Sequence, residues 1–303
     1  MNIFTESRAN IKVESFRFPS SYMWLSIMVL LWGASWPVTK NALLHTSPLW
    51  LASIRFSSAG LCLFCYLAVR GQLKLPVAKD LPIIASVGLL QMMAFTGLVM
   101  VAMVHIDASR AVLLAYTTPL WCAVAAFVIF REAPSKAQVV ALIIGLVGVG
   151  VVCSPFELDW ASKGTVVGAI FLLLAGISWA FVILHVKKHN WVSSPVALAP
   201  WQMLHAAIPL SLAAYVMEDS PTQIPLNAER LGEIFFIGPA ATSVCFVISA
   251  EYGRRISAFG MSNFTMGVPL IGILFSYSCL DAPVSSVFLL GFFSSCLRSS
   301  CPP

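Results

Sequence analysis

Charge is scarce in this sequence, because Lys, Arg, Asp and Glu together make up only 10% of its 303 residues. An ordinary soluble domain is about 25% charged, and its polar residues cover the surface that contacts water. Here hydrophobic residues make up 59% and the mean hydropathy is +0.87. These values exclude most soluble enzymes and secreted disulfide scaffolds, and they predict a chain that lies in a lipid bilayer.

The sequence also lacks the patterns that accompany several other functions. Its net charge of +5 comes from basic residues scattered in ones and twos, so no basic face predicts nucleic-acid binding. Cys62 and Cys65 have the spacing of a redox or metal motif, but they lie within an apolar run without a second pair or a flanking His, and we interpret them as small apolar side chains. No catalytic triad, phosphate-binding loop or metal signature is present. We therefore predict no enzymatic activity, no metal and no cofactor.

Apolar runs long enough to cross a bilayer, which takes about 20 residues, are abundant. Backbone hydrogen bonds cannot stay open in hydrocarbon, and the runs show no period-two alternation, so they predict helices rather than a barrel. The expected fold class is an all-α integral membrane protein with ten transmembrane helices. The ten runs are 22–38, 48–69, 81–104, 108–130, 138–153, 164–186, 196–217, 231–250, 256–280 and 284–297.

The basic residues are distributed unevenly between the two sides of the predicted membrane. With the N-terminus in the cytoplasm, 13 of the 18 lie on the inner side and 4 on the outer side, while Arg55 lies within a span. Positively charged loops favour the cytoplasm, so both termini are expected there. We interpret the basic segment 1–21 as a cytoplasmic extension, because no small-residue cleavage site follows the first apolar run.

Two halves of the chain share a series of short motifs. The segment LLWGASW at 30–36 reappears as LLAGISW at 173–179, 143 positions later. A Pro-Leu pair in the fourth run and an acidic-Ala-Pro segment after it recur in and after the ninth run. Because five spans are an odd number, the second half would enter the membrane from the opposite side. The sequence thus predicts two inverted five-helix repeats, at 22–154 and 164–297, with the substrate site between them.

At these motifs the chain resembles the drug/metabolite transporter superfamily, specifically its EamA-type exporters, over roughly residues 22–293. The resemblance implies a multi-pass protein of the bacterial inner membrane that exports amino acids, related metabolites or drug-like amphipathic compounds by alternating access. It implies a small-molecule substrate and the lipid bilayer as partners, leaves a homodimer open, and does not identify the substrate. The alternative is a non-transporting binding or regulatory protein of the same fold.

Polar residues within spans are costly in hydrocarbon and tend to face a cavity, which makes them candidates for substrate binding. Arg55 lies about 11 Å, or two helical turns, inside the outer end of the second span. Facing the cavity, it would bind a substrate carboxylate through two hydrogen bonds. Alternatively, it extends toward water or caps a neighbouring helix.

The aromatic candidates and the polar residues around two prolines also have two interpretations. Trp36 and Trp179 occupy the same place in the repeated motif, and they either line the cavity or anchor the helices at the membrane interface. Side chains near a proline either contact a ligand or repair the hydrogen bonding that the proline interrupts. The candidates of this second kind are Tyr116, Thr117 and Trp121 around Pro119, and Asn263 before Pro269.

Three further candidates are an amide in the third span, Gln91, and two residues in the seventh span, Gln202 and His205, which are predicted to fall on the same face of a helix. A buried His is either an interhelical contact or a proton carrier. All 13 acids fall at or beyond span ends, whereas proton-driven exporters usually have a carboxylate within the membrane. The sequence therefore gives no support for proton antiport and leaves facilitated diffusion or exchange open, and proton coupling through His205 is a hypothesis.

The last apolar run departs from the family pattern. Residues 284–297 would rise only about 21 Å as a helix, against about 30 Å of hydrocarbon. A polar, Cys- and Pro-containing segment then follows. We interpret this end as a short or truncated tenth helix.

Overall fold

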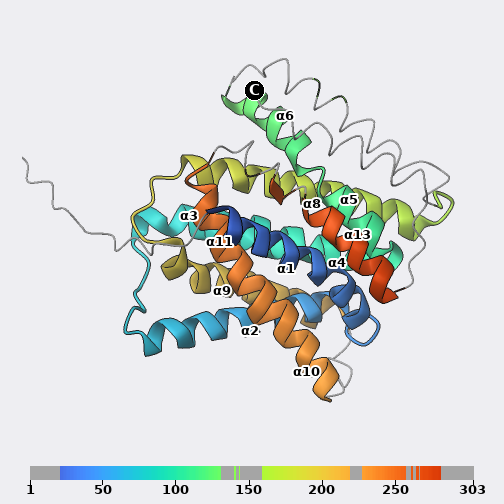
Figure 1. The fold of residues 1–303 in the computed structure, drawn as a ribbon, viewed down its shortest axis with the longest axis horizontal. Helices are drawn as coiled ribbons and strands as arrows, with labels where there is room; N and C mark the ends of the chain where they lie inside the picture. Colours follow the sequence, from blue (N-terminus) through green and yellow to red (C-terminus); the bar gives the residue numbers. More distant parts are fainter. Residues whose placement is uncertain are drawn as a thin grey trace, which may run out of the picture.

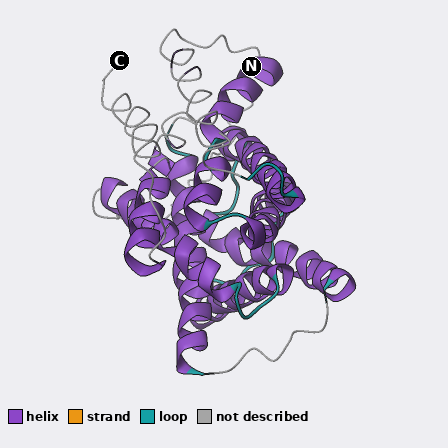
Figure 2. Ribbon diagram, turned by 90° about the vertical axis from the view of Figure 1, so that its right-hand side faces the viewer, coloured by secondary structure: helices purple, strands orange, loops and turns teal. Residues whose placement is uncertain are grey.

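The computed structural model describes residues 21–130, 159–218, 227–256 and 267–280, together with 140, 143, 261, 264 and 265. Within these residues every regular element is a helix, and short loops join them (Figure 2). Five stretches are long and apolar enough to cross a membrane, as the sequence predicts. They are Pro48–Val69, Ala78–His105, Lys163–Lys188, Pro195–Met217 and Ala228–Gly253.

Where the structure describes them, the predicted spans agree with the helices to within a few residues, apart from a break in the fourth run; of the predicted ninth run, 256–280, the continuous described helix covers Gly267–Leu280. The predicted cytoplasmic segment before residue 21, the fifth run except for two positions, and the short tenth run lie outside the described residues. The first half contains α1 (Ser21–Ala42), α2 (Pro48–Val69), η1 (Ala78–Asp80), α3 (Leu81–Ala85), η2 (Ser86–Phe95), α4 (Thr96–His105), α5 (Ala108–Ala115) and α6 (Thr118–Phe130). The second half contains α8 (Lys163–Lys188), α9 (Pro195–Met217), α10 (Ala228–Phe235), η3 (Phe236–Ser243), α11 (Val244–Gly253) and α13 (Gly267–Leu280).

The fourth run is not one helix, because α5 ends at Ala115 and α6 begins at Thr118. Pro119 lacks the amide hydrogen that would continue the ladder to Ala115. Two hydroxyl groups donate hydrogen bonds to backbone carbonyls at the break. Thr117 Oγ1 donates to Leu114 O at 2.8 Å, and Thr118 Oγ1 donates to Ala115 O at 3.0 Å. The break is therefore satisfied within the chain itself.

The third helix of each half contains a wider π-helical turn, η2 in the first half and η3 in the second. In a π turn the backbone hydrogen bonds join residues five apart. Such turns are rare in proteins overall, but those that occur are frequently at functional sites. Pro239 lies inside η3, where a proline would interrupt ordinary α-helical bonding. Both π segments pack against the other half: η2 contacts α8 and α9, and η3 contacts α1 and α2.

The repeated motifs make matching contacts across the two halves. Gly33 of α1 lies against Ile271 of α13, and Gly176 of α8 lies against Trp121 of α6. Trp121 and Ile271 each follow the proline of their Pro-Leu pair by two residues. In each half, the glycine of the first helix thus allows the fourth helix of the other half to approach closely.

The second and third helices of each half likewise contact helices of the other half. The helix pair α2 and α9 packs along its length, and α10, η3 and α11 run across α1 and α2 (Figure 1). A Cβ atom on Gly88 of η2 would lie 2.8 Å from Gln202 O of α9. A Cβ atom on Gly238 of η3 would lie 3.1 Å from Arg55 O of α2. Arg55 and Gln202 both lie seven residues after the proline that opens their helix.

We expect Gly88→Ala to destabilise the protein by about 1–3 kcal/mol, the usual cost of forcing extra atoms into a packed interface. The new methyl group would meet the backbone of α9 at Gln202 and the Cβ atom of His205, both at 2.8 Å. Thermal unfolding in detergent measures the change. Gly232→Ala in α10 is the matched control, because no atom of the described residues outside the backbone of its own helix lies within 4 Å of its Cβ position; a melting temperature equally unaffected in both variants would contradict the tight contact.

Candidate functional site

A cavity of about 50 Å³ lies where helices of the two halves meet. It is lined by side chains from α1, α2, η2, α4, α8 and α11, and by Tyr116 at the break between α5 and α6. Its lining combines aromatic rings, methionines, hydroxyls, one amide and one guanidinium. The lining residues are Trp32, Ser35, Trp36, Thr39, Arg55, Gln91, Phe95, Thr96, Val99, Met100, Met103, Tyr116, Trp179 and Phe246.

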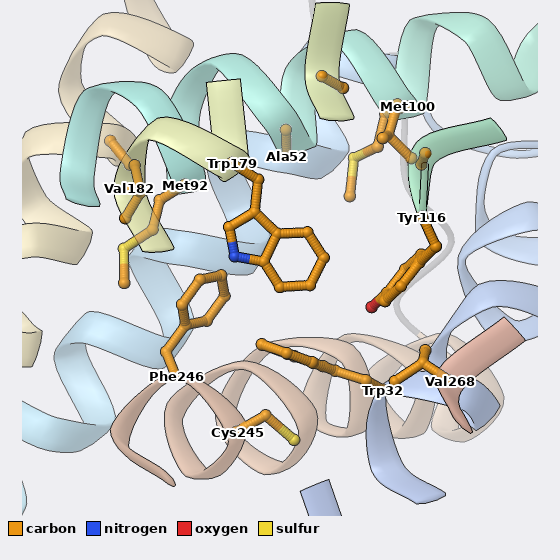
Figure 3. Packing of buried hydrophobic residues seen from close by; sticks show 14 of the residues in the cluster. Trp32, Ala52, Met92, Met100, Tyr116, Trp179, Val182, Cys245, Phe246 and Val268 are labelled. Carbon is orange, nitrogen blue, oxygen red and sulfur yellow. The ribbon is translucent and has the colours of Figure 1, made fainter. Parts of the chain in front are cut away.

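The aromatic rings form a connected cluster around Trp179. The Trp179 ring lies edge-on to those of Trp32, Phe95 and Tyr116, with centroids 5.6, 5.1 and 5.1 Å apart. Trp32 also contacts Phe246 at 5.5 Å, and the labelled rings point toward one another (Figure 3). Edge-to-face pairs at these distances are favourable beyond the area that they bury, so the cluster gives the cavity firm apolar walls.

Arg55 supplies the positive charge of the cavity. Its Nε donates to Thr242 Oγ1 of η3 at 2.6 Å, and it lines the cavity with Tyr116 and Phe246. Among the described residues, no Asp or Glu lies within ion-pairing distance of its guanidinium. A guanidinium without a carboxylate partner among the described residues keeps N–H donors that suit an anionic group.

Uncharged polar groups occupy other parts of the wall. Gln91 of η2 and Thr96 of α4 line the cavity and are 5% exposed. Ser35 Oγ is engaged by its own helix, since it donates to Trp32 O at 2.8 Å. Thr39 Oγ1 is buried and makes no hydrogen bond to a described residue. A ligand with a second polar group would find Gln91 and Thr39 available.

The structure brings five of the ten predicted residues together at this cavity. They are Trp36, Arg55, Gln91, Tyr116 and Trp179. Of the other five, Asn263 lies outside the described residues, and four are placed elsewhere: Thr117, Trp121, Gln202 and His205.

Thr117 and Trp121 face α8 rather than the cavity. Trp121 Nε1 donates to Thr117 Oγ1 at 3.0 Å, and both residues lie against Gly176, with Thr117 Oγ1 3.1 Å and Trp121 Cδ1 3.4 Å from its Cβ position. Near Pro119, the two interpretations left open by the sequence therefore apply to different residues. Tyr116 lines the cavity, whereas Thr117 and Trp121 pack and repair the helix break.

Gln202 and His205 do not share an environment. Gln202 is 2% exposed in the packing of α9, whereas His205 is exposed and its Nδ1 lies 3.0 Å from Trp201 O. A separation of three residues turns a helix by about 300°, which leaves the two side chains about 60° apart. That angle is enough to place one inside the bundle and the other on its outer surface.

We expect His205→Ala to leave transport and its response to an imposed pH gradient within about twofold of wild type. An exposed side chain outside the cavity has no path by which to exchange a proton with a bound substrate. Flux into proteoliposomes with and without the gradient measures the effect. Loss of the pH response in this variant alone would restore the proton-coupling hypothesis.

The sequence interpretation missed several lining residues. Trp32 and Thr39 lie three or four residues before and after the Ser35–Trp36 pair, which is the spacing of one helix face, so Trp36 itself could have indicated them. Phe95, Met100, Met103 and Phe246 carry no such signal, because apolar side chains in a membrane helix face lipid, protein or cavity alike.

Sequence comparison decides the family. The sequence model of the EamA-like transporter family matches residues 19–154 and 166–297. This chain belongs to the EamA-like transporter family. It is therefore a multi-pass membrane transporter and not an enzyme, and the resemblance drawn from its motifs is confirmed.

Individual relatives are also transporters by name. The chain is 24% identical over 267 residues to the uncharacterized transporter YvbV of Bacillus subtilis, covering 88% of this chain and 86% of that protein. It is 29% identical over 204 residues to the uncharacterized inner membrane transporter YedA of Escherichia coli, covering 66% and 64%. A solved crystal structure matches with a TM-score of 0.68 at 17% identity, covering 92% of this chain and 95% of its own, and that likeness concerns the fold alone.

Proposed function

We propose that this EamA-family protein exports a small organic molecule that combines a carboxylate with an apolar or aromatic part, such as an amino acid or an amphipathic drug-like acid. The observation that carries the proposal is Arg55, a cation without an acidic partner among the described residues, in a cavity walled by aromatic rings. The guanidinium matches the carboxylate, and the rings match the apolar part. A polyanion or a bare metal ion fits this lining poorly.

Alternating access between inverted repeats is the mechanism we propose. The crossed contacts of Gly33 with Ile271 and of Gly176 with Trp121 support two halves of related structure at 22–154 and 164–297. The cavity volume of about 50 Å³ holds a few water molecules, while ligand pockets measure roughly 300–1,000 Å³. A substrate would therefore need the halves to separate, which rocking of one half against the other provides.

The direction and the energy source are proposals of the same kind. No acid among the described residues lines the cavity, which favours facilitated diffusion or exchange over proton antiport. The excess of basic residues on one side supports cytoplasmic termini in an inner membrane, and YedA is named as an inner membrane transporter.

Counterflow in proteoliposomes tests the function. Vesicles containing the purified protein are loaded with one member of a panel of amino acids and amphipathic acids, and uptake of its labelled form from a dilute outer solution is measured. We expect carboxylates with an aromatic or branched apolar part to exchange, and their amides to exchange poorly. Binding without flux for every compound would instead identify the alternative, a membrane binding or regulatory protein of the same fold.

A further inference from the structure

Arg55 is held by a residue of the opposite half, Thr242 of η3. We propose that Thr242 is a positioning residue that orients the Arg55 guanidinium for end-on binding of a carboxylate. The inference rests on the proposed function, in which Arg55 binds the substrate. It adds a residue that the cavity lining does not include.

The π turn places the Thr242 hydroxyl where it can serve Arg55. Thr242 Oγ1 donates to Ile237 O, five residues earlier, at 2.6 Å, and accepts from Arg55 Nε at 2.6 Å. Thr242 and Ile237 are fully buried. Because a hydroxyl has one hydrogen, donation to Ile237 O leaves its lone pairs facing Arg55. The orientation of the Thr242 hydroxyl is thereby fixed as an acceptor for Arg55, which can only donate.

This bond decides which edge of the guanidinium remains for a ligand. Arg has five N–H donors in a planar fork, and one of them, on Nε, is taken by Thr242. A carboxylate can bind the side edge, through Nε and one terminal nitrogen, or the end, through both terminal nitrogens. With Nε occupied, the end remains, and both terminal nitrogens can donate to one carboxylate. A single ammonium, as in Lys, has no such fork.

The first half of the chain shows that a π turn does not itself need this hydroxyl. Thr242 lies four residues after Gly238, and the residue four after Gly88 in η2 is Met92. The η2 turn packs against α9, where Gln202 is the counterpart of Arg55. Gln202 Nε2 makes no hydrogen bond to a described residue. Of the two π turns, only the one that contacts the arginine has a hydroxyl at this position. The hydroxyl is therefore not explained by a general need of π turns for an extra hydrogen bond.

The test uses a matched pair of probes, 3-phenylpropionate and its neutral amide, 3-phenylpropionamide. Binding to the purified full chain in detergent is followed by quenching of tryptophan fluorescence, since Trp32, Trp36 and Trp179 line the cavity. We expect Thr242→Val to weaken 3-phenylpropionate binding about tenfold, the size of one hydrogen bond to a charged group, and to leave the amide unchanged. Thr242→Ser should restore binding to within about twofold, since it keeps the hydroxyl.

A second comparison separates positioning from packing. In an Arg55→Ala background, Thr242→Val should cause no further loss, because the donor that Thr242 orients is already gone. Where the valine variant does not fold, Thr242→Ala gives the same comparison. Equal losses for the acid and the amide, or an unchanged affinity for the acid, would overturn the positioning role.

Failure of the proposed function has a different signature. If the wild-type protein binds the acid no better than the amide, or if Arg55→Ala leaves acid binding intact, then Arg55 is not the carboxylate site. If wild type discriminates through Arg55 but Thr242→Val changes nothing, only the inference about Thr242 fails. The two results are read from the same set of titrations.

Discussion

Arg55→Ala is expected to weaken binding of an aromatic carboxylate about 100-fold, which corresponds to about 2.7 kcal/mol. The variant removes the positive charge that the sequence places within the second span and the structure places in the cavity. It loses two charge-assisted hydrogen bonds to the ligand, in surroundings where aromatic rings keep the local dielectric low. Counterflow rate against substrate concentration, together with fluorescence titration of 3-phenylpropionate, measures the loss.

Two controls make this result specific. Arg70→Ala removes the same charge from the end of the same helix, at an exposed position outside the cavity, and should change affinity by less than about twofold because an exposed charge is screened by solvent. The neutral amide should bind Arg55→Ala and wild type alike. A carboxylate that is transported normally by Arg55→Ala would remove the anionic site from the proposed function.

Asp80→Asn is expected to destabilise the protein by about 3 kcal/mol, because it leaves buried hydrogen-bond donors without an acceptor. The Asp80 side chain is fully buried. Its Oδ1 accepts from Val192 N at 3.2 Å and lies 3.3 Å from His189 Nε2, and its Oδ2 accepts from Ser193 N at 2.9 Å. An amide would turn an N–H toward one of these donors, whichever way it is oriented.

This carboxylate connects the two halves, since it begins the third span and receives its hydrogen bonds from the loop between α8 and α9. Its loss should lower the melting temperature in detergent by about 6 °C or more. Asp107→Asn is the control: that carboxylate is 61% exposed and pairs with Arg110 three residues later, so its cost should stay under about 1 kcal/mol. Equal melting temperatures for Asp80→Asn and wild type would show that the loop is held by other contacts.

A similar carboxylate contact lies at the start of the second helix. Glu218 directly follows α9, and its carboxylate oxygens accept from Leu49 N at 2.8 Å and Trp50 N at 3.1 Å, in the first turn of α2. Free amide groups at a helix start favour a negative charge. Asp80 and Glu218 thus each connect one half to the other: Asp80 binds the loop before α9, and Glu218 binds the start of α2. The cavity lies between helices of both halves.

The sequence around the broken fourth span predicted only part of its structure. Pro119 predicted irregular backbone, and the side chains near it predicted either repair or ligand contact. The structure shows that the hydroxyls of Thr117 and Thr118 donate to carbonyls at the helix break, while Tyr116 lines the cavity. Which of three consecutive side chains meets the cavity depends on the rotation of the helix relative to its neighbours, and the sequence of one segment does not contain that rotation.

The sequence by itself determined the membrane location, the helical class, the approximate bounds of the described spans and the family. Each of these depends on the composition and order of residues along one segment, because hydrocarbon requires apolar side chains and closed backbone hydrogen bonds. Tertiary structure alone decided which faces meet: it joined Arg55 to Thr242, 187 positions apart, buried Gln202 while exposing His205, and placed Trp121 on Gly176. In a membrane the hydrophobic effect does not distinguish lipid from a neighbouring helix, so the pairing of faces follows from close packing and hydrogen bonding between distant segments.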